Sequence, residues 1–394
     1  MVNIQSLWRV SLLCLSVVAF VFCTPLEDVP IVTDIGTPKM SINVHKTGVI
    51  ATSGDNILRL ENGIFYMTND LGATWKSLEN SIGIISYVHW FKDNSCLICG
   101  RSKAYWVDSS FSELHKSEVF DYDGSVLDDD SPHFYAPLRG RKDYDELNGV
   151  ETWIWNDYFG CVDGYISRIW QTNDCGRTIQ CICKNGETRT TDGEVITCLH
   201  FHDCALRGSR GDLYITSGDV GKQCKLIKGF WADDAWHYEI LGEGELFKFG
   251  TVIINEPFLM FLSDYTGYGS TGILRVAFSD AGSIEQYQYV YNCPDNLPLS
   301  KTYKMNDYSF ITYDGSIKGK LLVSYKSGKY QNLSVSFDDE FSSISFLSNQ
   351  NNGGLVLIRK GDGYNISDLK LNDCMYDFSD AMEEAGYRDF RHVQ

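Results

Sequence analysis

Helical periodicity is nearly absent from this sequence before residue 375. Short runs rich in Val, Ile, Tyr, Phe and Trp alternate instead with turns rich in Gly, Asn and Asp, a pattern typical of β-strands. With 394 residues, 43% of them hydrophobic, the chain can bury a large core. The sequence therefore predicts an all-β protein without a substantial helical layer.

Long apolar runs are missing after residue 24, so we expect no membrane span in the mature chain and a soluble protein. The first 24 residues combine Arg9 with an apolar run at 11–22 and small residues near its end. This pattern predicts a cleaved signal peptide at residues 1–24 and a secreted protein; a buried N-terminal helix is the alternative. Sequons at Asn332 and Asn365 fit secretion and mark candidate glycosylation sites.

Basic residues are scarce, with 34 Lys and Arg against 52 Asp and Glu and a net charge of -18. Such a charge opposes non-specific attraction to nucleic acids and anionic membranes. We therefore expect neither as a partner.

Several sequence signatures of known chemistry are also missing. The chain has no Gly-x-Ser-x-Gly elbow, His-Glu-x-x-His motif, phosphate-binding loop or Cys/His spacing of a structural zinc site. Of 13 cysteines, Cys14 and Cys23 leave with the signal peptide, and the odd number that remains leaves one thiol unpaired unless chains pair. Cys96 and Cys99 are expected on opposite faces of one strand, so no bond between them is predicted.

A strand signature recurs along the chain at intervals of about 50 residues, close to the length of a four-stranded propeller blade. It reads VIATSGD, CLICGR, YFGCVDG, LYITSGD, FLMFLSD, SFITYDG and VLIRKGD, ending at Asp55, Arg101, Asp163, Asp219, Asp264, Asp314 and Asp362. We interpret each copy as the second strand of a blade. The final polar residues would then ring one face, although Gly-Asp and Asp-Gly pairs also simply make good turns.

These repeats predict a single β-propeller at residues 25–374, with seven four-stranded blades; six or eight blades are alternatives. A strand near the N-terminus, DVPIVTD at 28–34, is expected to close the ring as the outer strand of the last blade, which hides both edges. The polar segment 121–148 is expected to form a long loop. The tail at 375–394 has the composition of one short helix.

A turn motif occurs twice, as TNDLGATW at 68–75 and TNDCGRTI at 172–179. It resembles the Asp-box, S-x-D-x-G-x-T-W, of the sialidase-like BNR-repeat propellers. The resemblance implies a structural turn between the third and fourth strands of a blade, in which Asp accepts backbone N–H bonds, Gly takes a positive φ and Trp packs between blades. The matching residues are Asp70, Gly72, Thr74, Trp75, Asp174, Gly176 and Thr178.

Histidines gather in the segments expected to be first strands: His45, His89, His200 and His202. His200 and His202 are two residues apart and share one face of a strand, and the loops carrying Asp219 and Asp264 are rich in glycine. We therefore propose His200, His202, Asp219 and Asp264 as catalytic candidates at the mouth of the channel. General acid–base chemistry and a metal ion would both use this arrangement, and satisfied core histidines are the alternative.

The Asp-box resemblance implies a protein that recognises or processes glycans or polysaccharides, hydrolase-like or lyase-like. The three arginines of a sialidase site are not apparent: the chain has no Arg-Ile-Pro motif and no arginine between residues 25 and 58. Arg101, Arg168 and Arg275 are isolated. Whether the protein is an enzyme stays open, no cofactor follows from the sequence, and a non-catalytic lectin-like or protein-binding scaffold is the alternative.

Overall fold

The fold is all-β in the computed structural model. The model describes residues 32–36, 39–44, 49–53, 56–61, 64–70, 74–79, 85–100, 102–127, 134, 145–157, 166–263, 272–292, 299–305, 308–313, 320–324, 330–335, 343–347, 355–359 and 373–377. Within these ranges the only helical segments are short 3-10 turns: η1 (Gly208–Arg210), η2 (Gly221–Gln223), η3 (Glu245–Phe247), η5 (Phe278–Asp280) and η6 (Ile284–Gln286).

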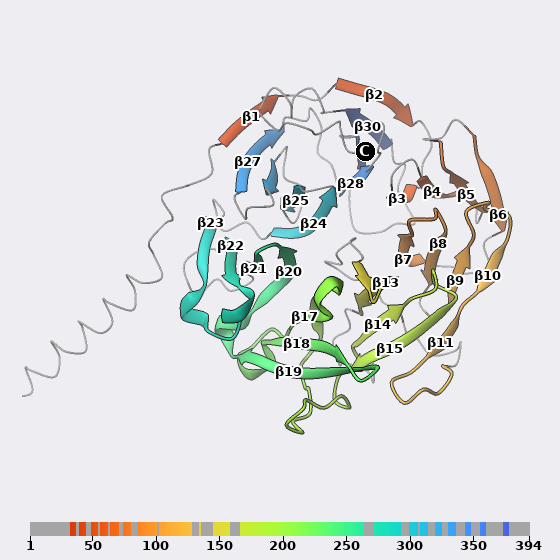
Figure 1. The fold of residues 1–394 in the computed structure, drawn as a ribbon. Coiled ribbons are helices and arrows are strands. Elements are labelled where there is room, and N and C mark those ends of the chain that lie inside the picture. The colour runs from red at the N-terminus through yellow and green to blue at the C-terminus, as the bar shows by residue number, and fades with distance from the viewer. Residues whose placement is uncertain are drawn as a thin grey trace, which may run out of the picture.

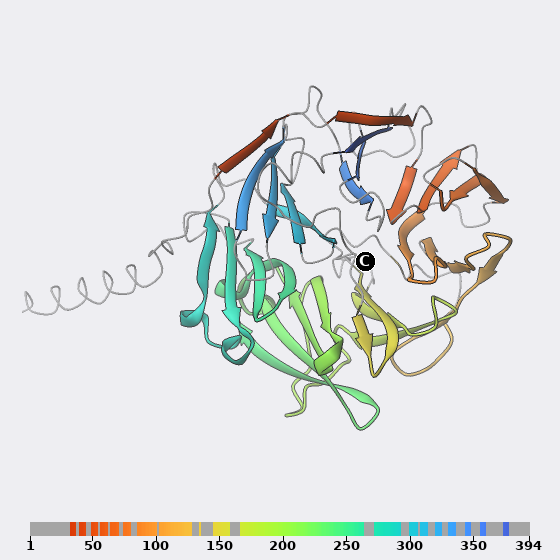
Figure 2. The ribbon, with the colours of Figure 1, turned by 45° about the horizontal axis from the view of Figure 1, so that its top comes forward.

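The described strands form seven sheets of four or five strands. Figure 1 shows the sheets arranged around a common centre, and the tilted view in Figure 2 shows the same ring. Four-stranded sheets in a ring are the blades of a β-propeller. The prediction of an all-β propeller fold is confirmed at this level.

Three of the sheets come from the first half of the chain. The first contains β3 (Val49–Ser53), β4 (Asn56–Glu61), β5 (Ile64–Thr68) and β6 (Lys76–Glu79). The second contains β7 (Ile85–Trp90), β8 (Cys96–Gly100), β9 (Ala104–Val107) and β10 (Leu114–Lys116). The third contains β12 (Asp145–Leu147), β13 (Val150–Asn156), β14 (Arg168–Thr172), β15 (Thr178–Lys184) and β11 (Glu118–Phe120).

The other four sheets come from the second half of the chain, with one N-terminal strand in each of the last two. The fourth contains β16 (Phe201–Arg207), β17 (Asp212–Ser217), β18 (Lys225–Ala232) and β19 (Ala235–Glu243). The fifth contains β20 (Phe249–Asn255), β21 (Phe258–Ser263), β22 (Gly272–Ala277) and β23 (Gln288–Asn292). The sixth contains β24 (Leu299–Met305), β25 (Tyr308–Tyr313), β26 (Lys320–Ser324), β27 (Tyr330–Val335) and β1 (Val32–Gly36). The seventh contains β28 (Ser343–Leu347), β29 (Leu355–Arg359), β30 (Asp373–Asp377) and β2 (Lys39–Val44).

The hydrophobic core lies between neighbouring sheets. All five residues of β8 are buried, because alternate side chains face opposite neighbours. Cys96 packs with Leu58 and Phe65 of the first sheet, whereas Cys99 packs with Trp153 of the third. Both are free thiols on opposite faces of β8, as the sequence predicts, and burial raises the pKa of each thiol well above its ordinary value.

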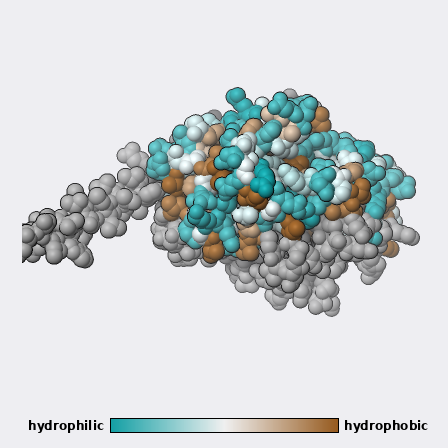
Figure 3. Space-filling model, turned by 90° about the horizontal axis from the view of Figure 1, so that it is seen from below, coloured by the Kyte–Doolittle hydropathy of each residue, from teal (hydrophilic) through white to brown (hydrophobic). Residues whose placement is uncertain are grey.

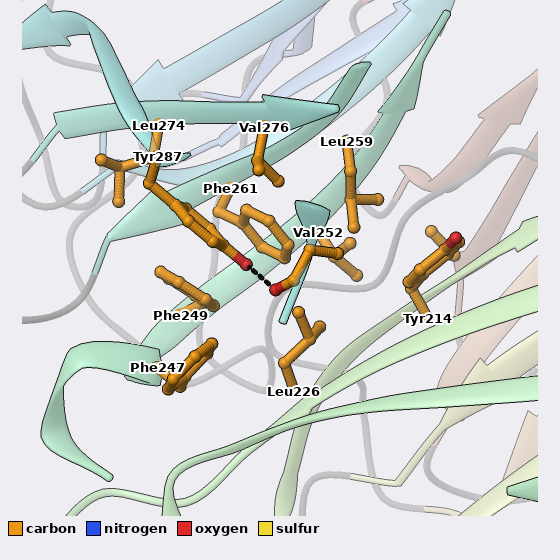
Figure 4. Close-up of a cluster of buried hydrophobic side chains, with 12 residues drawn as sticks. Tyr214, Leu226, Phe247, Phe249, Val252, Leu259, Phe261, Leu274, Val276 and Tyr287 are labelled. Atoms are coloured by element: carbon orange, nitrogen blue, oxygen red, sulfur yellow. Dashed lines mark hydrogen bonds between the residues drawn. The ribbon is translucent and has the colours of Figure 1, made fainter. Parts of the chain in front are cut away.

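A similar cluster fills the space between the fourth and fifth sheets. Figure 4 shows Phe249, Phe261 and Tyr287 packed together in it, with Tyr214 and Leu226 from the fourth sheet. The rings of Phe249 and Phe261 stack with their centroids 4.2 Å apart. This packing fixes the start of β20, where the backbone approaches β16.

Strand order differs from the sequence prediction in two respects. VIATS is β3, which pairs only with β4 and contacts the inner strands of both neighbouring sheets, so it is a first strand and not a second. The second strand of the third sheet is β14, which pairs with β13, and all of YFGCVDG, at 158–164, lies outside the described residues. CLICG, LYITS, FLMFLS, SFITY and LVLIR each follow an inner strand as predicted.

Segments distant in sequence complete several sheets. The N-terminal β1 pairs in parallel with β27, and β2 pairs antiparallel with β30 of the last sheet. The strand expected to complete the last sheet, at 28–34, thus takes a different partner, because two N-terminal strands serve two neighbouring sheets. β30 reaches Asp377 and crosses the boundary predicted at residue 374.

The predicted loop at 121–148 is preceded by β11, which pairs in parallel with β15. Asp121, directly after β11, accepts hydrogen bonds from Arg168 Nε at 3.1 Å and Lys184 Nζ at 2.9 Å. Burial opposes ionisation of this carboxyl group, but the bonds from Arg168 and Lys184 outweigh it and lower the pKa of Asp121 to about 2. Within the loop, Phe134 is buried against Trp155 and Trp170.

The surface is mixed in character. Figure 3 shows one face on which hydrophilic residues interleave with separate hydrophobic areas. Large exposed apolar side chains, such as Val126, Val150 and Val220, are scattered along the chain. Among the described residues, no helix has the length and apolar character needed to cross a membrane.

We predict that Asp121→Asn destabilises the protein by about 1–2 kcal/mol at pH 7, because it removes the carboxylate that binds Arg168 and leaves Lys184 with Glu187 alone as an acidic partner. The folded-state pKa of Asp121 lies below its ordinary value of 3.8, so the carboxylate stabilises the fold above about pH 4 and this contribution is lost as the pH falls through about 2. Urea unfolding across this range tests the prediction. Asp123→Asn, which changes an exposed neighbour, is the control. The prediction fails if the difference in unfolding free energy between the wild type and Asp121→Asn does not change with pH.

Candidate functional site

The candidate site lies at one end of the two inner strands of the fourth sheet. Phe201 pairs with Ser217, but Asp203 pairs with Thr216, so His202 is the extra residue of a β-bulge in β16. Pairing continues past the bulge, where the Gly218 N–H donates to the His200 carbonyl at 3.0 Å. The bulge aims the His202 side chain toward the turn that follows β17.

Three side chains meet at this end. His200 Nε2 and His202 Nε2 are 2.9 Å apart. Asp219 places its carboxylate 3.3 Å from His202 Nε2 and 3.6 Å from His200 Nε2. Both histidines are buried, whereas the Asp219 side chain is 36% exposed. Among the described residues, this is the only group of three or more His, Cys, Asp or Glu side chains close enough to share a metal ion.

The protonation of His202 follows from its other neighbour. His202 Nδ1 lies 2.9 Å from the carbonyl oxygen of Phe249. Because a carbonyl oxygen can only accept a hydrogen bond, Nδ1 carries a proton. In the neutral ring, Nε2 can therefore accept a hydrogen bond from His200, and it donates to Asp219 only when the ring carries a second proton.

Asp219 is the ionised member of the group. The hydrogen bond from His202 lowers the pKa of Asp219 to about 2, against the opposing effect of partial burial; the charges of His200, His202 and Lys248 act in the same direction as the bond. The site therefore presents a carboxylate to solvent at all ordinary pH values.

Buried polar groups brace the strand that carries the histidines. Asn156 Nδ2 donates to the carbonyls of Phe201 at 3.1 Å and His202 at 3.3 Å, which joins β13 to β16. Asp203 accepts the Val252 N–H at 3.0 Å and joins β16 to β20. Inner edges of neighbouring sheets leave backbone groups without ladder partners, and these side chains satisfy them.

The turn that presents Asp219 depends on Gly218. Gly218 has a φ of +79°, and a Cβ added there would come within 1.9 Å of the Gln223 carbonyl oxygen. Ser217 Oγ donates to the same carbonyl at 3.0 Å. Only glycine fits this close turn without a shift of the backbone.

The predicted site residues have different outcomes. The structure brings His200, His202 and Asp219 together, while Asp264 lies outside the described residues. Of the seven residues predicted to ring one face, Asp219 alone is described. His45 is likewise outside the described residues, and His89 stacks on Trp153 at 3.7 Å between the second and third sheets.

Other contributors were not predicted. Asn156, Asp203 and the Phe249 carbonyl support the histidines but belong to three different sheets, and no sequence signal links them. Arg168, by contrast, binds Asp121, and Arg275 contacts Gln288 and the Phe258 ring within its own sheet.

The two Asp-box-like turns share one geometry. Asp70 accepts the Thr74 N–H at 2.9 Å, and Asp174 accepts the Thr178 N–H at 2.9 Å. Each aspartate also accepts the hydroxyl of the same threonine, at 2.6 and 2.7 Å. Both carboxylates thus bind within their own turns.

The surroundings of the two turns differ. Gly176 has a φ of +83°, and a Cβ there would lie 3.0 Å from the Leu97 side chain; Trp75 is partly buried, and Gly72 lies outside the described residues. The first turn joins the third and fourth strands of its sheet, as predicted. The second turn joins β14 to β15. With β13 counted as the first strand, these are the second and third strands of the third sheet, whereas a turn between the third and fourth strands was predicted.

Comparisons with known proteins show similarity of fold only. No family model matches the chain, and no curated protein matches it. Solved structures that resemble it include YCF48 bound to D1 peptide, at 15% identity and TM-score 0.47, covering 88% of this chain and 99% of that one. The β-propeller domain of Cps50 (Swd1) from Myceliophteria thermophila resembles it at 10% identity and TM-score 0.46, covering 86% and 99%.

A further solved structure is PorZ, a surface component of the type-IX secretion system of Porphyromonas gingivalis. It resembles the chain at 12% identity and TM-score 0.43; the match covers 81% of this chain but 36% of PorZ. Likenesses at these values carry no argument about ligand or activity.

We predict that Gly218→Ala destabilises the protein by about 2–3 kcal/mol, because the new Cβ combines an unfavourable φ with a backbone clash. Gly221→Ala is the matched control: Gly221 also has a positive φ, +52°, but open space around its Cβ position. It should cost only about 1 kcal/mol. Denaturant unfolding of the two variants measures this difference. Equal losses of unfolding free energy would contradict the prediction, because the clash at Gly218 would then cost nothing.

We predict that Asp70→Ala and Asp174→Ala each cost about 1 kcal/mol of unfolding free energy, since the threonine N–H groups they leave are exposed and can bind water instead. Neither should alter ligand binding in the folded fraction. Thermal unfolding and binding assays of both variants test this, and loss of binding at unchanged stability would assign the turns to the ligand site.

Proposed function

We propose that the protein is a secreted, closed seven-bladed propeller that recognises a glycan through His200, His202 and Asp219. The observation that carries the proposal is the convergence of two buried imidazoles and one exposed, ionised carboxylate in the turn after β17. Closure of the ring is supported by the pairing of N-terminal β2 with C-terminal β30.

The chemistry of the cluster suits a neutral sugar. An ionised carboxylate accepts hydrogen bonds from sugar hydroxyls, and Asp219 keeps its charge over a wide pH range. Val220, next along the chain, is 60% exposed and offers an apolar contact beside the carboxylate. The net charge of -18 disfavours a polyanionic glycan.

Recognition is favoured over hydrolysis by the composition of the cluster. Most glycoside hydrolases place two carboxyl groups across the scissile bond, one as acid and one as base or nucleophile. The cluster holds one carboxylate, so we propose binding as its primary role. Turnover of a polysaccharide is a separate outcome of the test below.

We predict that Asp219→Asn weakens glycan binding at least about 10-fold, since it replaces a charged acceptor by a neutral amide. A glycan array identifies the ligand, and titration of the wild type and variant gives the affinities; release of new reducing ends is measured in parallel. The control is Asp234→Asn, which removes one charge from an exposed turn of the same sheet at a φ of +58° that asparagine tolerates.

The outcomes separate the alternatives. Reduced binding in Asp219→Asn but not Asp234→Asn supports the site. Equal affinity of the wild type and a folded Asp219→Asn places the glycan elsewhere. Binding to no glycan overturns the proposal in favour of a protein-binding scaffold.

A further inference from the structure

We propose that His200 Nε2, His202 Nε2 and the Asp219 carboxylate bind one divalent transition-metal ion of the zinc class. This inference deepens the proposed function. It rests on that function only for the role of the metal ion, which would bind a sugar hydroxyl at its open position. Metal binding itself depends on the cluster alone and is testable without a glycan.

The spacing of the ligand atoms matches a single ion. Zinc binds His nitrogen and carboxylate oxygen at about 2.0–2.1 Å, so tetrahedral ligand atoms lie about 3.3 Å apart. The three separations in the cluster are 2.9, 3.3 and 3.6 Å. They bracket the required value, so small side-chain rotations would bring all three ligands into position.

The chemical identity of the ligands selects the class of metal. Imidazole favours zinc, copper, nickel and iron, whereas calcium and magnesium prefer all-oxygen sites. Two imidazoles and one carboxylate therefore favour zinc-class ions over alkaline-earth ions. Three protein ligands leave a fourth position for water or a ligand oxygen, as in zinc sites with an open position.

The open position lies on the Asp219 side of the cluster. Both imidazoles are buried, and Asp219 is the one member with substantial exposure, 36% of its side chain. A molecule arriving from solvent would therefore meet the ion beside Asp219 and Val220. This is the same surface that the glycan proposal uses.

The surroundings hold the ligands before any metal binds. The Phe249 carbonyl accepts from His202 Nδ1 and so directs Nε2 into the cluster; metal-binding histidines usually donate their other ring N–H to a carbonyl or carboxylate in this way. Phe249 is itself fixed by the aromatic packing of Figure 4. The Gly218 N–H holds the His200 carbonyl at 3.0 Å, which ties the backbone of one ligand to the turn that carries another.

The apo cluster has an electrostatic reason to accept a cation. His200 Nε2 and His202 Nε2 share one hydrogen bond at 2.9 Å, whose proton a metal ion would displace, and the negatively charged Asp219 carboxylate lies beside both nitrogens. A divalent ion would serve both nitrogens and the carboxylate at once.

The test uses the purified full chain after removal of metal with a chelator. Zn²⁺ affinity is measured by competition with a chromophoric zinc indicator, and Co²⁺ is used as a spectroscopic probe of the ligands. We expect one tight Zn²⁺ per chain and a Co²⁺ spectrum without a thiolate charge-transfer band, which excludes the cysteines as ligands. His202→Ala and Asp219→Asn should each weaken Zn²⁺ binding at least about 100-fold, more than the roughly 10–100-fold cost of losing a residue that only holds a ligand in place.

His237→Ala is the matched control, because it removes an imidazole from β19 of the same sheet; its affinity for Zn²⁺ should equal that of the wild type. Circular dichroism checks folding, and if the buried His202→Ala does not fold, the exposed Asp219→Asn decides. A folded wild type that binds no Zn²⁺, a folded Asp219→Asn that binds it normally, or a thiolate band overturns the proposal.

The metal and glycan proposals fail separately. Zn²⁺ binding without affinity for any glycan leaves the metal site standing and removes the glycan function. Glycan binding that persists in the chelated protein, together with no Zn²⁺ binding, removes the metal site alone.

Discussion

Burial of both sheet faces, wherever the side chains are described, is the constraint on which this part of the structure depends. A strand whose side chains all point into apolar surroundings, such as β8, needs a second sheet on each side. The apolar cluster around Trp153 joins the second and third sheets, and the cluster around Phe249 joins the fourth and fifth. In the arrangement of Figure 1, the sheet that contains β8 has a neighbouring sheet on each side, as its burial requires.

The same arrangement creates a polar interior that the candidate site uses. Inner strands of neighbouring sheets approach each other without forming a ladder, so side chains must serve their backbone groups. Asn156 and Asp203 do this on either side of β16. They hold the bulged segment from two directions, and this support positions His202 against Asp219.

Much of the site's geometry arises from local departures from regular structure. The bulge at His202 and the left-handed Gly218 break the alternation of β16 and end β17 in a tight turn. Function in such folds resides in sites of this kind more than in the architecture. A regular strand pair of the same composition would not bring the side chains of His200 and His202 together beside Asp219.

The sequence by itself determined the β-class, the recurring strand units and the pairing of His200 and His202 with Asp219, because these depend on short-range patterns of burial and turn formation. It did not determine that VIATS is an inner strand, that the second Asp-box-like turn joins β14 to β15, or which sheets receive β1, β2 and β11. Those are choices among partners distant in the chain, and several strands have similar apolar faces. The Phe249 carbonyl and the Asn156 and Asp203 bridges were likewise set by tertiary structure alone, since backbone oxygens and lone polar residues gain their roles only when neighbouring sheets come together.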